Sequence, residues 1–270
     1  MGLLLALAGC DKVFSLRAIP DAPPIDAPPM CPPGIGHDED GDCIPDTTDK
    51  CPGIPDEAQP DGDGDRIGDD CDPDPAVPGN MNTLFVTFEA PSEQGSWNSI
   101  GAWSVAGDDY TNTDMTPFRE DWTYRNVSEY AVLDEIEARI TVGPLGTDDV
   151  KVGVGFYASG ATPTEWSCSL RRIANQAPKV EAYANQSPSF ASPLSPGTVF
   201  GDNQTYTFRM KVDGTSVHCD VRGEGGDTGQ ATATFTTFAP GYVGAFTTEA
   251  GAHVHYIAVY TVKPASAVSP

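Results

Sequence analysis

Basic residues are scarce in this chain of 270 residues: 15 Lys and Arg stand against 39 Asp and Glu, which gives a formal net charge of −24. Nucleic-acid binding needs clustered Lys and Arg that neutralise phosphates, so the shortage excludes a nucleic-acid partner. No stretch approaches the roughly 20 consecutive apolar residues of a membrane-spanning helix. No stretch shows a persuasive 3.6-residue apolar period either. The sequence therefore predicts neither a spanning protein nor a helical fold.

The seven cysteines are an odd number, so one of them is expected to have a role other than a disulfide. The apolar residues 3–8 lead into Gly9 and Cys10, and residues 1–10 resemble a bacterial lipoprotein signal, whose cysteine becomes the lipidated first residue of the mature protein. The resemblance implies a lipid anchor on Cys10. An ordinary secretory signal or a chance apolar start is the alternative. With Cys10 lipidated, the remaining cysteines can pair completely in an oxidising compartment.

The same resemblance implies a place in the bacterial envelope, at the outer membrane or cell surface, with a periplasm-facing position as the alternative. Residues 11–36 then form a proline-rich tether. Prolines fix φ and leave no apolar periodicity, so this tether is expected to be extended and disordered.

Residues 37–75 carry over half of the excess charge, with 15 Asp and Glu against Lys50 and Arg66, a net charge of −13. A solvated, disordered acidic run is the simplest interpretation. The spacing argues against it, because residues 38–49 and 61–72 repeat one pattern with Asp at positions 1, 3, 5, 9 and 12. Oxygen ligands at this spacing suit a loop that wraps Ca²⁺, which accepts six to eight of them.

The flanks of the two copies carry a family resemblance. Cys51 and Pro52 follow the first copy, and Cys71 lies inside the second. With the Asp-x-Asp-x-Asp loops, they resemble thrombospondin type 3 repeats over residues 38–74. The resemblance implies a module at residues 37–75 that folds around Ca²⁺ and the disulfides Cys31–Cys43 and Cys51–Cys71. The ligands that it implies are Asp38, Asp40, Asp42, Asp46, Asp49, Asp61, Asp63, Asp65, Asp69 and Asp72.

The residues alone lead to the same expectation. Ile44, Ile54 and Ile67 are the only large aliphatic side chains of the module, too few to offset chain entropy without metal or disulfides. The sixth position departs from the pattern, since Cys43 and Arg66 replace the glycine that makes the sharp turn. A side chain at positive φ is costly, so either the Ca²⁺ affinity falls or the turn differs. We expect weak sites, with dissociation constants of about 10⁻⁴ M.

After a linker at residues 76–81, residues 82–264 alternate between strand-like runs and Gly, Pro, Asp or Asn, and residues 265–270 form a tail. Residues 204–212 place apolar side chains on one face, and Asp213-Gly214 predicts a two-residue hairpin turn. Cys168 and Cys219 both lie on apolar faces and predict a disulfide, with two free buried thiols as the alternative. Strands are predicted at residues 84–88, 130–142, 150–157, 204–212, 215–222, 231–238, 241–247 and 253–262.

This strand pattern resembles a known fold. The hairpin around Asp213-Gly214, residues 241–244 and the closing strand 254–260 are similar to the concanavalin A-like, laminin G-like jelly roll. The predicted fold is therefore all-β: an antiparallel jelly-roll β-sandwich, preceded by a small Ca²⁺-bound, disulfide-stapled, irregular acidic module and a disordered N-terminal tether. In that superfamily the fold binds glycans or proteins, and some branches hydrolyse polysaccharides.

Signs of catalysis are few, with no Ser-His-Asp signature, phosphate loop or nucleotide fingerprint. Jelly-roll glycoside hydrolases commonly carry their carboxylates on a Glu-x-Asp-x-x-Glu strand. Around Glu135 and Glu137 the third carboxylate is missing, so these two are expected on the polar face of a half-buried strand. His253 and His255 are spaced to share a strand face, as Zn²⁺ ligands do, but no third ligand is identifiable and a sheet-face or binding-groove role is favoured.

Aromatic residues among polar ones at residues 95–130 predict a ligand site. Such rings beside Asp, Asn and Arg suit saccharide stacking, and a place in the core is the alternative for several of them. Residues 174–203, rich in Pro, Ser, Asn and Gln, predict a long surface loop that rims the site. The candidate ligand residues are Trp97, Tyr110, Trp122 and Tyr124.

The leading hypothesis is a surface-anchored, Ca²⁺-binding lipoprotein whose acidic module is a stalk. The stalk presents a non-enzymatic β-sandwich recognition or adhesion domain for a glycan or protein, and the membrane is contacted through the lipid only. The alternatives are a polysaccharide-active enzyme of the jelly-roll class and a purely structural envelope protein. Paired carboxylates across a groove would favour the enzyme, and an aromatic-lined groove without them would favour binding.

Overall fold

The computed structural model describes residues 31–90, 92–127, 133–158, 165–184, 187–193, 200–226, 228–238 and 240–262. The predicted lipidation site Cys10, most of the tether and the tail 265–270 lie outside these ranges. Within them, no helix has the length and apolar character needed to cross a membrane.

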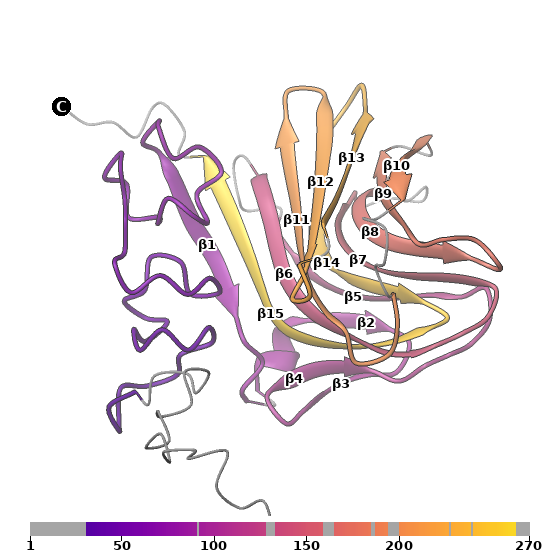
Figure 1. Cartoon of the computed structure of the whole chain (residues 1–270), viewed down its shortest axis with the longest axis horizontal. Coiled ribbons are helices and arrows are strands. Elements are labelled where there is room, and N and C mark those ends of the chain that lie inside the picture. Colours follow the sequence, from indigo (N-terminus) through magenta and orange to yellow (C-terminus); the bar gives the residue numbers. More distant parts are fainter. Residues whose placement is uncertain are drawn as a thin grey trace, which may run out of the picture.

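Two antiparallel sheets pack face to face (Figure 1), which confirms the predicted all-β sandwich. The one short helix of the described residues is a 3₁₀ turn, η1 (Glu93–Ser96). Sheet A has the order β13 (Thr228–Thr234), β12 (Ser216–Gly223), β11 (Thr205–Asp213), β6 (Leu133–Leu145), β15 (Ala250–Val262), β4 (Asp109–Asn112) and β3 (Trp103–Ala106), with β1 (Asn80–Val86) beside β15. Sheet B has the order β10 (Ser187–Pro193), β9 (Lys179–Ala184), β8 (Glu165–Ile173), β7 (Asp149–Tyr157), β14 (Tyr242–Thr248), β5 (Glu120–Asn126) and β2 (Asn98–Ile100).

The core lies between the two sheets because side chains alternate between the faces of each strand. On β11, Tyr206, Phe208 and Met210 point into the core and are at most 2% exposed. Thr207 and Arg209 alternate with them and lie on the outer face of sheet A. The predicted alternation of residues 204–212 is therefore confirmed.

The three predicted disulfides are present. One of them joins β8 of sheet B to β12 of sheet A and closes the sandwich covalently. The other two lie in the acidic module and close loops whose constraint on the unfolded chain is worth about 3 kcal/mol each. The pairs and their Cα–Cα distances are Cys168–Cys219 at 5.0 Å, Cys31–Cys43 at 5.0 Å and Cys51–Cys71 at 5.5 Å.

Three local predictions need correction. The first strand, β1, begins at Asn80 rather than after residue 82, and it ends at Val86, before Phe88 turns to a positive φ of 62°. The hairpin turn lies at Gly214 and Thr215, because Asp213 still pairs with Ser216. The surface loop predicted at residues 174–203 includes two strands, β9 and β10. Pro188 and Pro193 lie on β10, the edge strand of sheet B, which is the place where a sheet tolerates prolines.

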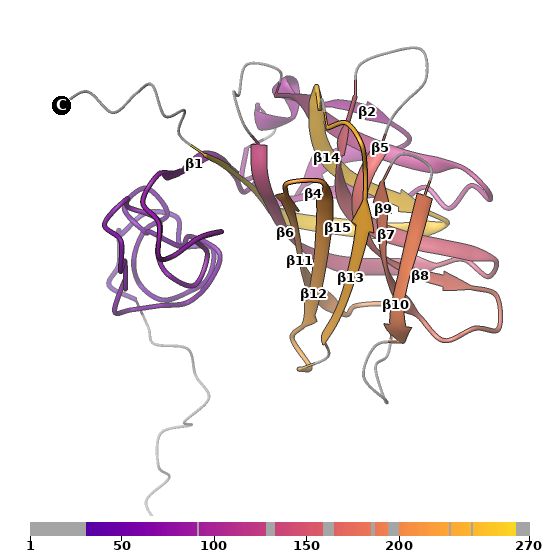
Figure 2. The ribbon, with the colours of Figure 1, turned by 90° about the horizontal axis from the view of Figure 1, so that it is seen from above.

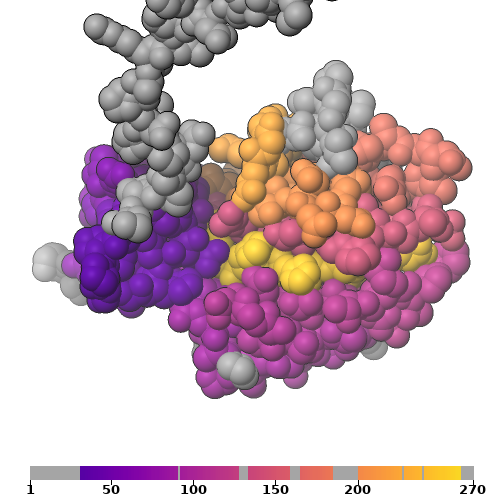
Figure 3. Space-filling model, turned by 60° about the horizontal axis from the view of Figure 1, so that its bottom comes forward, coloured from indigo at the N-terminus to yellow at the C-terminus, as the bar shows by residue number. Residues whose placement is uncertain are grey.

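The acidic module does not stand away from the sandwich. Residues 31–79 form an irregular lobe that packs against the outer face of sheet A (Figures 2 and 3). Cys51, Ile67 and Cys71 form a second, small core with the outward side chains of β15, and Ile54 and Phe85 pack against it. The β15 side chains are Tyr256, Ala258 and Tyr260, each at most 2% exposed. The predicted free stalk is therefore wrong: the module is a cap on sheet A.

Gly53 marks the closest approach between the module and the sheet. The Tyr256 hydroxyl donates to Glu137 at 2.7 Å and also lies 3.4 Å from the Gly53 carbonyl oxygen. A Cβ atom at residue 53 would lie 2.4 Å from Cζ of Tyr256. Only a glycine therefore fits at this contact.

Replacing Gly53 with alanine should loosen the cap by about 1–3 kcal/mol, the usual cost of overpacking. Amide hydrogen exchange should show this as faster exchange across residues 49–59, with the sandwich strands unchanged. Gly95→Ala is the matched control, because a Cβ atom there meets nothing within 4 Å. Equal protection in the two variants would contradict the contact.

Candidate functional site

The two Asp loops of the module fold in the same way. In each loop, the Asp at position 1 accepts a hydrogen bond from the backbone N–H of position 4. The Asp at position 3 accepts from position 5, the Asp at position 5 from position 7, and the Asp at position 9 from position 2. The pairs of the first loop span 2.8–3.1 Å and those of the second 2.6–3.1 Å. The carboxylates thus hold their own loops by turn-type bonds, which leaves their other oxygens gathered on one side.

The sixth position keeps the turn despite its side chain. Cys43 has a φ of 74° and Arg66 a φ of 86°, so both adopt the left-handed conformation that glycine would adopt without cost. The turn is therefore kept, with a side chain in a strained conformation at each sixth position, and the reduced Ca²⁺ affinity stays a prediction.

Six of the predicted ligands come together as expected. Asp38, Asp40 and Asp42 form one group, and the equivalent residues of the second loop form another, with one oxygen of each member within 4.8 Å of the others. A third group joins Asp42 and Asp49 to Asp56. Asp42, which is 4% exposed, therefore belongs to two groups.

The remaining predicted ligands are placed differently. Asp46 lies with His37 and Glu89, and its Oδ2 is 2.7 Å from Nδ1 of His37. Asp69 and Asp72 belong to no such group among the described residues. Asp69 instead accepts from the Gly62 N–H at 2.6 Å and ties the ends of its loop.

The sequence pattern did not point to Asp56. Its backbone N–H donates to Oδ2 of Asp42 at 3.0 Å, and the equivalent bond of the second loop runs from Gly79 to Asp65 at 2.9 Å. The backbone position is thus repeated, but only the first copy carries a carboxylate there. A search for repeated Asp residues cannot find a ligand that occurs once.

The loops fit a hard divalent cation. Oδ2 of Asp40, Asp49, Asp56 and Asp63 is buried and has no hydrogen-bond partner. Burial raises the pKa of Asp40 to about 7 and that of Asp72 to about 6, and neighbouring carboxylates add to the rise. Unpaired buried carboxylate oxygens at close range are unfavourable, and a hard cation such as Ca²⁺ would supply the charge and the coordination that they lack.

Beneath the module lies a buried charge cluster on the outer face of sheet A. Glu135 and Glu137 are 3% and 1% exposed. Arg209 lies between them, with Nε 3.1 Å from Glu135 and Nη2 2.6 Å from Glu137. Its Nη2 also donates to the Asp70 carbonyl oxygen of the module at 2.9 Å. The two glutamates were predicted on the polar face of a half-buried strand, but beneath the cap both are buried, while Arg139 on the same face stays partly exposed.

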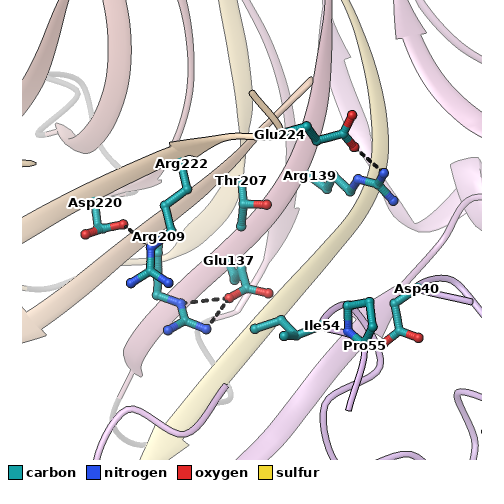
Figure 4. A pocket seen from close by; sticks show the side chains of 11 residues that line it. Asp40, Ile54, Pro55, Glu137, Arg139, Thr207, Arg209, Asp220, Arg222 and Glu224 are labelled. Carbon is teal, nitrogen blue, oxygen red and sulfur yellow. Dashed lines mark hydrogen bonds and ion pairs between the residues drawn. The ribbon is translucent and has the colours of Figure 1, made fainter. Parts of the chain in front are cut away.

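A groove of about 340 Å³ opens between the module and sheet A (Figure 4), within the size range of small-ligand sites. The sheet contributes two cross-strand rows, one of Arg222, Thr207 and Arg139 and the next of Asp220, Arg209 and Glu137. Glu224 extends the sheet side. Across the groove lie Asp40, Gly53, Ile54 and Pro55 of the module.

The predicted aromatic ligand residues divide between the core and the outer face of sheet B. Trp97 and Tyr110 pack inside the sandwich, 6% and 0% exposed, and offer no ring face to a ligand. The core position of both rings contradicts their prediction as ligand residues: β4 directs Tyr110 inwards, and Trp97, at the end of η1, packs against it. Trp122 and Tyr124 of β5 lie outside that core, on the outer face of sheet B.

That outer face carries further aromatic residues. Trp122 stacks on Phe246 with ring centroids 4.5 Å apart, and Tyr124 meets Tyr242 edge-on at 5.3 Å. Trp122 and Phe246 are 3% and 1% exposed and form the floor, while Tyr124 and Tyr242 are half-buried. Gly244 pairs across strands with Tyr124 on one side and with Gly155 on the other. Because neither glycine has a side chain, the surface beside the Tyr124 ring is recessed.

The other end of the same face is polar. Glu165 of β8 pairs across strands with Tyr157 and accepts a hydrogen bond from Ser167 at 2.6 Å. Burial raises the pKa of Glu165 to about 7, and repulsion from Glu120 adds to the rise. On β9, Glu181 is 1% exposed and pairs with an arginine at 2.6 Å.

His253 and His255 do not form a metal group among the described residues. Nδ1 of His255 is 2.7 Å from Asp109, and its Nε2 is 2.6 Å from the Thr141 hydroxyl, so both ring nitrogens have partners. His253 lies 3.6 Å from the same carboxylate. The sheet-face role that the sequence favoured accounts for both residues.

Comparison with known proteins supports the fold and no closer relationship. No protein-family model and no curated protein matches the sequence. The chain is similar to the CBM2 module of the evolved Dit protein of Lactobacillus casei BL23 phage J-1, with 11% identity and a TM-score of 0.50 over 69% of this chain and 97% of that one. Peanut lectin follows at 9% identity and a TM-score of 0.49, over 68% and 96%. The carbohydrate binding module CBM66 from Bacillus subtilis matches at 13% identity and 0.43, over 59% and 92%. At such identities the first likeness shows the jelly-roll fold alone.

Proposed function

We propose that this protein is a non-enzymatic glycan-binding lipoprotein of the bacterial envelope, anchored through a lipid on Cys10. The observation that carries the proposal is the outer face of sheet B, where Tyr124 and Tyr242 stand half-buried over a floor of Trp122 and Phe246. Partly exposed rings beside polar groups suit the apolar faces and hydroxyl rims of sugar rings. A carbohydrate-binding module among the proteins of similar fold agrees with this proposal.

The acidic module is proposed to bind Ca²⁺ in its two Asp loops and at the group of Asp42, Asp49 and Asp56. The oxygen-only donor set and the unpaired buried oxygens support this assignment. A bound cation would neutralise the gathered carboxylates, which allows the module to keep its shape against sheet A. In this proposal Ca²⁺ serves structure, and it takes no part in sugar binding on sheet B.

A polysaccharide hydrolase is the second candidate, because one observation favours it. Glu165 is a buried carboxyl on the same face, and a pKa of about 7 would keep it partly protonated at neutral pH, as a general acid requires. Glu120 is the neighbouring carboxyl. Hydrolysis of the bound oligosaccharide, lost in Glu165→Gln while binding is retained, would favour the hydrolase over the binding protein.

The test is calorimetric titration of the full chain, produced with Cys10→Ser, against cello-, manno- and xylo-hexaose in Ca²⁺. Tyr124→Ala should weaken binding about tenfold, since a stacked ring contributes up to about 1.5 kcal/mol beyond its buried area. Phe118→Ala is the matched control, because Phe118 is an aromatic that is 79% exposed outside both sheets. Binding of no oligosaccharide would sink the glycan proposal, and unchanged binding by Tyr124→Ala would remove the site from sheet B.

A further inference from the structure

The groove between the module and sheet A has a polar side and a less polar side. On the sheet, Thr207 lies between Arg139 and Arg222 across three strands, with the acidic and basic row of Asp220, Arg209 and Glu137 beside it. On the module, Ile54 and Pro55 supply apolar surface (Figure 4). A ligand in this groove meets hydrogen-bonding groups on the sheet side, and apolar carbon beside the Asp40 carboxyl on the module side.

The charges of the groove disfavour an anionic ligand. Each of its three guanidinium groups already has a carboxylate partner: Arg139 pairs with Glu224, Arg209 with Glu137, and Arg222 with Asp220 at 3.0 Å. Asp40 adds an acidic group that lines the other side. An arginine keeps further N–H donors after one pairing, and a carboxylate keeps acceptor sites. Neighbouring donors and acceptors of this kind suit the hydroxyl groups of an uncharged saccharide.

The module segment that lines the groove is flanked at both ends by members of one carboxylate group. Asp49 directly precedes the segment 50–55 and Asp56 directly follows it, and both belong to the group that includes Asp42. The Asp56 N–H also donates to Asp42, and the Ile54 N–H donates to the Cys51 carbonyl oxygen at 2.9 Å. Without a cation, mutual repulsion of the three carboxylates pulls on both ends of this segment.

We propose that this groove is a second binding site, for an uncharged saccharide, and that the cation held by Asp42, Asp49 and Asp56 sets its affinity. This site goes beyond the proposed function, because the face of sheet B lies on the other side of the sandwich and needs no cation. By linkage, the saccharide should also tighten cation binding at this group by the same factor.

The test uses the full chain with Cys10→Ser and the same three hexaoses, titrated with Ca²⁺ and with chelator. We expect two binding events in Ca²⁺ and one in chelator. Thr207→Trp, which fills the groove, should abolish the cation-dependent event, and Arg222→Ala should weaken it about tenfold. Arg222 is 63% exposed, so its removal tests the site without threatening the fold. Tyr124→Ala should affect only the cation-independent event, which separates failure of this proposal from failure of the proposed function.

The cation dependence is tested with a matched pair of variants. Asp56→Ala should abolish the cation-dependent event and should accelerate hydrogen exchange at the Ile54 amide. Asp63→Ala removes a carboxylate from the second loop, none of whose residues lines the groove, and should leave both readouts unchanged. Cation-dependent binding that survives Thr207→Trp and Arg222→Ala would overturn the groove as a site. Equal behaviour of Asp56→Ala and Asp63→Ala would overturn the cation link.

Discussion

Chelating divalent cations should unfold residues 31–79 and leave the sandwich folded. The module has three large aliphatic side chains and 15 acidic residues at 37–75, so burial alone cannot balance its conformational entropy. Its buried oxygens, among them Oδ2 of Asp40 and Asp63, have no partner without a cation. The disulfides restrict the unfolded module, but they do not remove the repulsion between its carboxylates.

Hydrogen exchange with and without chelator measures this directly. The amides of Ile44 and Ile67 donate to Asp42 and Asp65 at 2.8 and 3.0 Å inside the two loops. They should exchange about a hundredfold faster after chelation, since a cation at a hundred times its dissociation constant stabilises a site by about 2.7 kcal/mol. Amides of β7 and β8 in sheet B serve as the internal control and should not change. Equal protection of the Ile44 amide with and without chelator would contradict the proposal that Ca²⁺ stabilises the module.

Local features of this fold could be predicted from the sequence because they depend on neighbouring residues. The Asp spacing predicts the loop geometry, and the carboxylates of positions 1, 3 and 5 lie together in both loops as expected. The alternation along residues 204–212 correctly predicted which side chains of β11 point into the core. The apolar faces on which Cys168 and Cys219 lie correctly predicted their disulfide. In each case the deciding pattern of side chains lies within one strand or one loop, although the disulfide itself joins the two sheets.

Features that depend on contacts between distant segments could not be predicted. Trp97 and Trp122 occur in similar polar surroundings, but Trp97 follows the turn η1 and lies in the core, whereas Trp122 lies on β5 outside that core. The docking of the module depends on Gly53 meeting Tyr256, 203 residues apart in sequence. The burial of Glu135 and Glu137 is a consequence of that docking. The hairpin turn was predicted one residue too early for a local reason. Asp213 still pairs with Ser216 in the strand ladder, and Gly214 alone takes the positive φ.

Replacing Arg209 with methionine should destabilise the protein by about 3–5 kcal/mol at neutral pH, the cost of leaving a buried charge without its partner. Methionine keeps much of the apolar stem, so the loss is mainly electrostatic. Arg222→Met is the matched control: its pair with Asp220 is exposed and should contribute less than about 1 kcal/mol. Adding Glu135→Gln and Glu137→Gln to Arg209→Met should recover much of the loss, because no buried charge then remains unpaired. Urea unfolding in constant Ca²⁺ measures all of these values.

The pH dependence separates charge from packing at this cluster. Burial raises the pKa of Glu135 to about 8 from an ordinary value of 4.5, despite the opposing pull of Arg209. The folded protein therefore keeps this proton where the unfolded chain has lost it, and this contribution to stability is full below pH 4.5 and is lost as the pH rises through 8. Without Arg209, a protonated Glu135 needs no counter-charge, whereas an ionised one does. The cost of Arg209→Met is measured at each pH as the difference in unfolding free energy from the unsubstituted protein, so that the pH dependence of the Asp loops cancels. This cost should be smaller near pH 5 than near pH 8.5. A cost that does not change with pH would mean that Arg209 supports the cap through its packing and its bond to the Asp70 carbonyl, and not through its charge.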